Sequence, residues 1–322
     1  MVYPKDVALR KANLAQLVLN LRSLFAYFLL MRLPTLIFLG LLSANMAFAS
    51  DPGWQPLFDG KDLTGWDTEM MNIPDPTWDV PGLKRDAGGT YVEALGKNRD
   101  PLHVFTVTTV DGQPAIHVSG QGFGVLMTTG TFGNVHVHLE IKWGDRKWGK
   151  KIGKPFDTGL LYFCHSEAGV ADKTWPRGLE FQICQNEFGD LYALASQVTV
   201  PAVMHTGSNG RPLYVYDPNG TPTLFIEQKP IGNHCAHIVD PEAPKGQWNT
   251  VDLFTLNGDS IHVVNGKVVM RLHNAQRLDG DTPAPLTSGK ICLQTEGGEC
   301  YFRDVEVESI TEFPRELAAP KM

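Results

Sequence analysis

The stretch Asn134–Lys142, which reads NVHVHLEIK, is the clearest strand signal in the chain and decides its fold class. Every second residue in it is apolar, and the residues between are polar or charged. Side chains of a β-strand point alternately to the two faces of a sheet. The pattern therefore predicts one face in a core and the other in water or at a binding surface. The apolar residues are Val135, Val137, Leu139 and Ile141, and the polar ones are His136, His138, Glu140 and Lys142.

Short runs of the same kind recur along the chain, and few segments show helical periodicity. Thr158–Cys164 and Gly178–Cys184 are expected to be central strands. Asn265-Gly266 separates two apolar runs, which is the strongest local signal for a hairpin because both residues tolerate positive φ. The pattern predicts an all-β sandwich. The other expected strands are Val104–Val107, Ala115–Val118, Val125–Thr128, Trp248–Leu256, Ser260–Val264, Lys290–Thr295 and Tyr301–Glu308.

Two segments are rich in Gly, Pro and polar residues and are expected to be long loops, Gly144–Pro155 and Pro201–Asp240. Loops of that length usually carry function or act as lids.

The composition is that of an ordinary globular protein. With 322 residues, 43% hydrophobic and 20% charged, the chain can bury a large core as one domain. The 32 glycines and 22 prolines indicate many turns. A net charge of −7 argues against a nucleic-acid partner, and no glycine-rich nucleotide loop opens a helix.

The first 49 residues resemble an export signal. Met31-Arg32 precedes the apolar run Leu33–Leu42, and small residues end at Ala47-Phe48-Ala49. A charged start, a short apolar stretch and an A-x-A site predict cleavage after Ala49, with translation starting at Met31. The sequence thus predicts a signal with an extension over residues 1–49, a single domain over residues 50–322, and a periplasmic or extracellular location. The alternative is an uncleaved membrane anchor that extends back through Leu24–Leu30.

Five cysteines follow the predicted signal, and none lies in a C-x-x-C pair, which argues against zinc and thioredoxin chemistry. Export permits disulfides. Cys164 and Cys184 end two predicted strands and would meet if those strands were neighbours at these ends. The alternative is that the cysteines are small buried hydrophobic residues.

Five segments resemble, in order, the 3-keto-disaccharide hydrolase family, and together they span Leu57 to Ile310. The resemblance implies a concanavalin A-like lectin/glucanase fold, a jelly-roll β-sandwich of two antiparallel sheets. It also implies cleavage of glycosides that carry a ketone at sugar carbon 3. The segments are LFDGKDLTGW (Leu57–Trp66), GLEFQI (Gly178–Ile183), GQWNTVDL (Gly246–Leu253), HVVNGKVV (His262–Val269) and GKICLQTEGGECYFRDVEV (Gly289–Val307).

Such a ketone acidifies the proton on carbon 2. A base removes it, the resulting enolate expels the group on carbon 1, and water then adds back. This route needs a base, a group that stabilises the enolate oxygen and an acid for the leaving group. Glu180, on the non-core face of a central strand, is the first choice for the base, and Gln182 on the same face is expected to bind a sugar hydroxyl. The alternative is a structural carboxylate paired with Arg177 or Arg303.

Histidines supply further candidates. His165 follows the strand Thr158–Cys164 and suits an acid, a base or a metal ligand, unless it is a plain surface histidine. His136, His138 and Glu140 share one strand face and are candidate ligands for a divalent metal ion, the one cofactor considered. The alternative for that face is a hydrated outer surface, with Glu140 also a candidate for substrate binding.

Arg303, Gln294 and Glu296 lie in the closing hairpin. Arg303 is expected either to stabilise an enolate or to pair with Glu296, and Gln294 and Glu296 are expected to bind substrate. Trp143 and Trp175 lie on or near the predicted loops, where aromatic faces pack against sugar rings. The alternative for both tryptophans is core packing.

Two rival functions remain open. The same sandwich serves carbohydrate-binding modules, and a fold does not fix a function. A conventional glucanase is disfavoured because the E-x-D-x-x-E pattern expected of a retaining glucanase on this fold is missing. For the leading function, an oxidised glycoside is the expected substrate. The oxidoreductase that makes the ketone must be a separate protein because the chain has no dinucleotide fingerprint.

Overall fold

The computed structural model describes residues 53–72, 80, 83–88, 91–227 and 230–317. The predicted export segment, residues 1–49, lies outside them. None of the described helices is long and apolar enough to cross a membrane.

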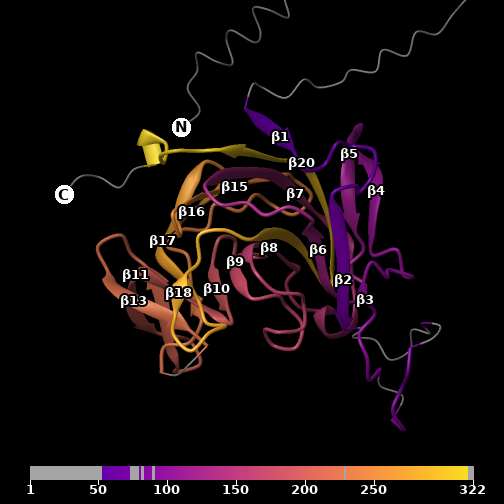
Figure 1. Ribbon diagram of the computed structural model, residues 1–322, viewed down its shortest axis with the longest axis horizontal. Helices are drawn as coiled ribbons and strands as arrows, with labels where there is room; N and C mark the ends of the chain where they lie inside the picture. The colour runs from indigo at the N-terminus through magenta and orange to yellow at the C-terminus, as the bar shows by residue number, and fades with distance from the viewer. Residues whose placement is uncertain (1–52, 73–79, 81–82, 89–90, 228–229, 318–322) are drawn as a thin grey trace, which may run out of the picture. The chain divides into compact units, whose positions relative to one another are not determined.

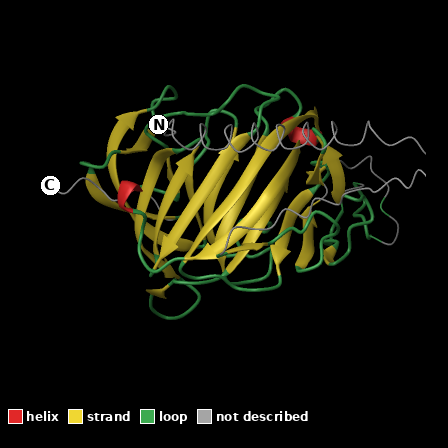
Figure 2. Cartoon of the chain, turned by 90° about the horizontal axis from the view of Figure 1, so that it is seen from above, coloured by secondary structure: helices red, strands yellow, loops and turns green. Residues whose placement is uncertain are grey.

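The described strands form two antiparallel sheets, which confirms the predicted jelly-roll sandwich (Figure 1). The larger sheet has twelve strands in the order β12-β11-β17-β16-β15-β7-β20-β5-β4, with β1 beside β20, β13 beside β11 and β18 beside β17. Figure 2 shows the strands running side by side across the molecule. The strands of the larger sheet are β1 (Trp54–Pro56), β4 (Phe105–Val110), β5 (Gln113–Val118), β7 (Val135–Lys147), β11 (Ser196–Thr206), β12 (Pro212–Tyr216), β13 (Thr221–Ile226), β15 (Asn249–Leu256), β16 (Asp259–Val264), β17 (Lys267–Arg277), β18 (Ala284–Pro285) and β20 (Gly298–Ser309).

The smaller sheet has eight strands in the order β14-β10-β9-β8-β19-β6-β2-β3. Two short 3-10 helices, η2 (Gly149–Lys151) and η3 (Arg315–Leu317), complete the described elements. The strands of the smaller sheet are β2 (Trp66–Asn72), β3 (Gly96–Lys97), β6 (Phe123–Thr128), β8 (Asp157–Cys164), β9 (Gly178–Cys184), β10 (Leu191–Leu194), β14 (His234–Cys235) and β19 (Lys290–Glu296).

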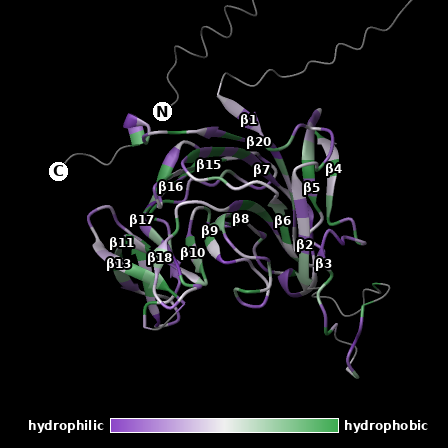
Figure 3. Cartoon of the chain, viewed as in Figure 1, coloured by the Kyte–Doolittle hydropathy of each residue, from purple (hydrophilic) through white to green (hydrophobic). Residues whose placement is uncertain are grey.

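The core lies between the two sheets and is built by the alternation that the sequence displays. Leu139 and Ile141 of β7 are buried in one cluster with Leu179 and Phe181 of β9. Figure 3 shows hydrophobic and hydrophilic residues alternating along many of the strands. Each sheet therefore turns its other face, called here its outer face, away from this core.

The predicted strands are confirmed with small shifts at their ends, and β9 has the predicted bounds. The hairpin at Asn265-Gly266 is also confirmed, because φ is +48° at Asn265 and +74° at Gly266.

Both predicted loops are wrong in part, and of the two alternatives for the cysteines the buried hydrophobic one is correct. Pro201–Asp240 is not one long loop, since its apolar residues alternate enough to form the rest of β11 together with β12, β13 and β14. The first residues of Gly144–Pro155 extend β7. Cys164 and Cys184 do not meet, because antiparallel pairing places Cys184 opposite Asp157, at the far end of β8 from Cys164. All five cysteines are free and buried.

Candidate active site

The outer face of the smaller sheet carries a row of polar side chains around Glu180. Along β9, Leu179, Phe181 and Ile183 belong to the core, so Glu180 and Gln182 project from the outer face. The register pairs Glu180 with Leu161 of β8 and Gln182 with Gly159 of the same strand. The predicted placement of Glu180 and Gln182 on one non-core face is therefore confirmed.

A covering loop hides part of this outer face from water. The loop contains Ala171 and Trp175, which pack in a second hydrophobic cluster with Leu161, Met127 and Cys292 of the sheet. The ring of Trp175 stacks on Phe123 with centroids 6.3 Å apart. Trp175 thus lies on the face of Glu180, where it packs in this hydrophobic cluster. Glu180 is consequently only 4% exposed.

The carboxyl group of Glu180 occupies the space beside Gly159, where any other residue would place a side chain. A Cβ atom on Gly159 would lie 2.4 Å from Glu180 Oε1 and 3.0 Å from Gln294 Oε1. Glu180 Oε1 and both polar atoms of the Gln294 amide are buried without a hydrogen-bond partner among the described residues. Buried polar groups are normally paired, so these atoms indicate a site built to receive polar groups of a ligand.

Burial raises the pKa of Glu180 well above its ordinary value, and the charges of Glu296 and Asp157 raise it further. The neighbouring Gln294 amide and Lys151 charge offset this rise in pKa only in part. A carboxyl group whose pKa is moved toward neutrality is a suitable general base or acid.

A cavity of about 450 Å³ adjoins this row of polar residues. Asp157, Cys184 and Glu296 of the sheet line it, and Lys151 of η2 closes its rim. Its volume falls in the range of small-molecule sites. Since Cys184, Gln182 and Glu180 alternate along the outer face of β9, the cavity opens at one end of the row that holds Glu180.

Lys151 bridges two carboxyl groups in this cavity. Its Nζ atom contacts Asp157 Oδ2 and lies 3.0 Å from Glu296 Oε1. Burial lowers the pKa of Lys151, but Glu296 and Asp157 outweigh it and raise that pKa overall. Burial raises the pKa of both Asp157 and Glu296. Lys151 therefore stays positively charged beside carboxyl groups that hold protons unusually well.

His165 lies apart from this cavity. It lines a second cavity of about 310 Å³ with Cys164, at the opposite end of β8 from Asp157. Its Nδ1 atom lies 3.1 Å from the Phe163 carbonyl oxygen, and its Nε2 atom is buried without a partner in the described part of the chain. The structure therefore gives His165 a separate pocket.

The structure does not bring Arg303 and Glu140 to Glu180. Arg303 Nε lies 2.5 Å from Glu140 Oε2, and the guanidinium lies 4.0 Å above the ring of Trp248. Both residues are on the outer face of the larger sheet, with the core between them and Glu180. Arg303 is near Glu296 in sequence, but the chain crosses from the smaller to the larger sheet at Gly297, between β19 and β20.

The other predicted residues of the larger sheet are also separate from this site. His136 Nε2 and His138 Nδ1 both contact Asp252 Oδ1, at 2.9 Å and 2.7 Å. Across the described ranges, no group of three or more His, Cys, Asp or Glu could hold a metal ion. Trp143 is 3% exposed and packs in the core on Phe156, so the core-packing alternative is the correct one for it.

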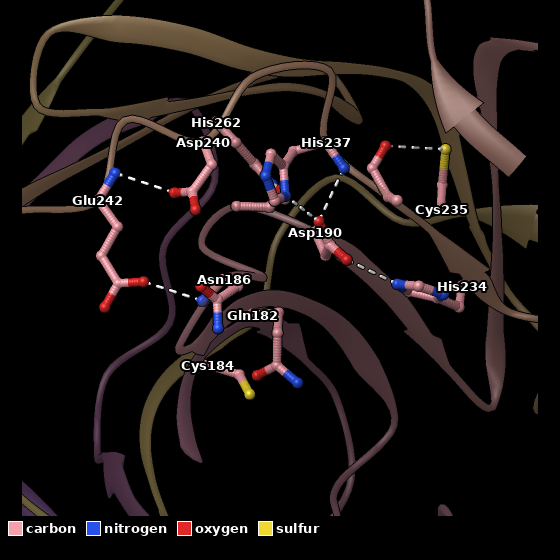
Figure 4. Close-up of polar contacts among 12 residues, drawn as sticks. Gln182, Cys184, Asn186, Asp190, His234, Cys235, His237, Asp240, Glu242 and His262 are labelled. Atoms are coloured by element: carbon pink, nitrogen blue, oxygen red, sulfur yellow. Dashed lines mark hydrogen bonds and ion pairs between the residues drawn. The ribbon is translucent and has the colours of Figure 1, made fainter. Parts of the chain in front are cut away.

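A cluster around Asp190 was missed from the sequence (Figure 4). Asp190 is 1% exposed and contacts His234 Nε2 through Oδ2 at 2.7 Å and His237 Nδ1 through Oδ1 at 2.5 Å. These bonds outweigh burial and lower the pKa of Asp190, while the Asp190 carboxylate raises the pKa of His237. The ring of Tyr192 stacks on His234 with centroids 4.5 Å apart and planes at 21°. Only the strand register brings these residues together, so no motif in the sequence signals them.

Comparisons with known proteins give a family and distant structural likenesses. A family model described as a 3-keto-alpha-glucoside-1,2-lyase-like domain matches residues 53–308. No curated protein matches the chain. Among solved structures, a candidate glycosyl hydrolase from Parabacteroides distasonis ATCC 8503 is 18% identical, with 80% of this chain and 94% of that one covered at a TM-score of 0.43. A second one from that organism is 17% identical, with 80% and 99% covered at 0.41. The carbohydrate binding module CBM66 from Bacillus subtilis is 8% identical, with 64% and 92% covered at 0.37.

Glu180→Gln is expected to stabilise the fold, by about 1–3 kcal/mol near pH 8 and by less near pH 5. The folded protein holds the Glu180 proton more tightly than the unfolded chain does, because burial raises the pKa of this group. Its contribution to stability therefore falls as pH rises from the ordinary carboxyl range toward the raised pKa. An amide carries no charge and escapes this loss. Urea unfolding at the two pH values measures the difference.

Glu299→Gln is the matched control on the larger sheet. Its Oε2 atom accepts hydrogen bonds from the backbone N–H groups of Asp145 and Arg146, and Oε1 lies 3.0 Å from His117 Nε2. These bonds lower the pKa of Glu299, so its amide variant should lose stability at about pH 8. A Glu180→Gln protein that is less stable than the wild type at both pH values would contradict the unpaired state of Glu180.

Proposed function

The chain belongs to the family of 3-keto-alpha-glucoside-1,2-lyase-like domains, a carbohydrate-active family, and from this premise we propose that it cleaves glycosides that carry a ketone at carbon 3. The observation that carries the proposal is the buried Glu180 carboxyl, whose Oε1 atom has no partner in the described residues and fits over Gly159. It is the base that this chemistry needs.

The reaction is an elimination across carbons 1 and 2. Glu180 takes the proton from carbon 2, and the electrons of that C–H bond form the enolate with the carbon 3 oxygen. The enolate collapses to a ketone with a double bond between carbons 1 and 2, and the bond from carbon 1 to the aglycone oxygen breaks. That oxygen leaves with the electron pair and takes up a proton. Addition of water across the new double bond then completes hydrolysis to a 3-keto sugar.

A base with a raised pKa suits this first step. The proton on the carbon beside a ketone is a weak acid, and a base whose pKa is nearer neutrality accepts it with a better driving force. The covering loop with Trp175 keeps bulk water from the base and strengthens electrostatic interactions there.

Two amides flank Glu180 and are suited to orient the sugar. Gln182 accepts a hydrogen bond from the Ile183 N–H through Oε1, which leaves its Nε2 amide hydrogens to donate to a ligand. The Gln294 amide is buried with both atoms unpartnered within the described residues. A sugar hydroxyl both donates and accepts hydrogen bonds, so it fits such an amide.

The cavity around Lys151 is suited to the leaving group. The departing aglycone oxygen develops negative charge and needs a proton. Lys151 supplies positive charge there, and Glu296, whose pKa burial raises, is the proposed proton donor. The proposal further expects an exported protein and a separate oxidoreductase that supplies the ketone.

The purified protein is expected to release sugar from a 3-keto disaccharide and not from its unoxidised parent. The parent has no acidic proton on carbon 2, so Glu180 has nothing to remove. Glu180→Gln is expected to lower kcat by a factor of about 10²–10⁴, the usual contribution of a general base. Chromatography of the released sugar measures both. Full activity of the variant would exclude Glu180 as the base, and tight sugar binding without any turnover by the wild type would favour a binding module.

Gly159→Ala is expected to lower kcat/KM by a factor of about 10–10² because its methyl group takes the place of Glu180 Oε1 and displaces the base. The backbone of Gly159 is not left-handed, so alanine fits it without strain from φ. Gly130→Ala is the matched control, since its Cβ would meet only side-chain atoms at ordinary contact distance. Equal loss in both variants would show a general defect of folding.

The activity should rise with pH as the base ionises and then fall as the acid loses its proton. Glu180 works as a carboxylate, and burial raises its pKa, so the fraction of active base grows as pH passes through that raised value. We expect kcat/KM on the 3-keto substrate to rise from about pH 5, with a midpoint above the ordinary carboxyl pKa of about 4.3, and to fall again as Glu296, whose pKa burial raises to about 7, loses the proton that it donates. Initial rates across this range measure it. A profile that is already flat from about pH 5 would mean that the base titrates like a solvent-exposed carboxylate.

A further inference from the structure

We propose that Tyr192 is a further catalytic residue, whose hydroxyl donates a hydrogen bond to the carbon 3 oxygen of the sugar as the enolate forms. The inference rests on the proposed function and extends it. The reaction requires a group that stabilises the enolate oxygen, and Arg303, the residue first expected to do so, lies on the other sheet.

Tyr192 is the cross-strand neighbour of Glu180. In the pairing of β9 with β10, Tyr192 stands directly opposite Glu180. Its chain neighbours Leu191 and Ala193 belong to the core, so Tyr192 projects from the same outer face as Glu180. Directly opposed residues in an antiparallel pair have Cβ atoms about 4.5–5.5 Å apart.

The adjacent positions of Glu180 and Tyr192 match the adjacent positions of the reacting atoms in the sugar. The proton that leaves carbon 2 and the oxygen on carbon 3 belong to adjacent carbons of one sugar ring. The base and the group that receives the enolate charge must therefore lie side by side. Two opposed residues on one sheet face satisfy this requirement.

The ring of Tyr192 is held in place from its far side. It stacks on His234, which is its own cross-strand neighbour in β14. His234 Nε2 in turn contacts the buried Asp190 carboxylate at 2.7 Å. A second histidine, His237, and its backbone N–H also bind Asp190, so this carboxylate is fixed before any ligand arrives. Preorganised donors of this kind lose little free energy to reorientation during the reaction.

The hydroxyl of Tyr192 is available to a ligand. It makes no hydrogen bond to any of the described residues, although the ring is partly buried against the second hydrophobic cluster. Burial raises the pKa of Tyr192, and the charges of Glu187 and Glu180 raise it further. Glu187 lines the cavity. The phenol therefore keeps its proton, which suits a hydrogen-bond donor, and tyrosine hydroxyls stabilise enolates in this way in other enzymes.

The chemical step remains balanced with Tyr192 in this role. The proton from carbon 2 goes to Glu180, and the negative charge that arises on the carbon 3 oxygen accepts the hydrogen bond from Tyr192. When the enolate collapses, the ketone is restored and the tyrosine keeps its own proton. No oxidant, reductant or additional reactant is required.

The experiment compares Tyr192→Phe with Tyr301→Phe in the full chain. Tyr301 on β20 of the larger sheet stacks on His117 with centroids 5.0 Å apart and planes at 21°, and His117 is bound by Glu299. It thus repeats the tyrosine, histidine and carboxylate arrangement away from the proposed site, with the difference that the Tyr301 hydroxyl donates to Glu299 Oε1 at 3.4 Å. Each variant removes one hydroxyl and leaves its ring stack in place, and thermal melting checks that both remain folded.

The readout is exchange of the carbon 2 proton of methyl 3-keto-glucoside in D2O, followed by mass spectrometry and corrected for exchange in buffer alone. It reports formation of the enolate before the leaving group departs. We expect Tyr192→Phe to slow the enzymatic exchange by a factor of about 10²–10³, the usual effect of one lost oxyanion donor. Tyr301→Phe should stay within about twofold of the wild type, since its hydroxyl has no access to the sugar.

Each outcome separates the inference from the function on which it rests. Wild-type protein that exchanges the proton, with Tyr192→Phe at the same rate, would overturn the role of Tyr192 and leave Glu180 and the proposed function standing. Wild-type protein that neither exchanges the proton nor cleaves the glycoside would overturn both. Equal slowing in Tyr192→Phe and Tyr301→Phe would also overturn the role of Tyr192, because the loss would not be specific to this face.

Discussion

The burial of one carboxyl group without a partner is the constraint on which the rest of the site depends. Leaving Glu180 Oε1 unpaired costs free energy, on the order of 1–3 kcal/mol. The structure tolerates this cost because the two sheets bury an extensive core. The Glu180 carboxyl stays buried because Gly159 leaves room for it on one side and the covering loop with Trp175 packs on the same face. Buried polar atoms without hydrogen-bond partners are usual where a site is preformed for a ligand.

The polar side chains named here differ between the two outer faces of the sandwich in whether they have partners. On the larger sheet, His136 and His138 share Asp252, and Arg303 pairs with Glu140. On the smaller sheet, the unpartnered buried atoms include those of Glu180, Gln294 and Asp157. Paired charges stabilise a surface in its resting state, whereas unpaired buried atoms leave hydrogen bonds to be made with something else. This contrast supports placing the proposed reaction on the smaller sheet.

Local pattern was sufficient to predict the strands, the sandwich and the shared face of Glu180 and Gln182, because alternation is a property of one strand. It was not sufficient for Arg303, since Gly297 carries the chain from one sheet to the other and a short sequence separation then spans the core. Asp157, Lys151 and Tyr192 were missed for a related reason. Their importance comes from the strands beside them, and strand order and register are set by the packing of the whole domain.

The chemistry also explains why the several carboxyl groups of the cavity do not make this a conventional glycosidase site. Ordinary glycosidases need two carboxyl groups that face each other across the glycosidic bond, one ionised and one protonated. Here Asp157 and Glu296 both contact Lys151, and in the proposed reaction Glu296 serves only to protonate the leaving group. Glu180 makes no ion pair with any of the described residues, and its Oε1 atom has no hydrogen-bond partner among them. An elimination needs a single carboxylate base, because the electrons that expel the leaving group come from the C–H bond on carbon 2 through the enolate, and not from a second carboxylate or an activated water.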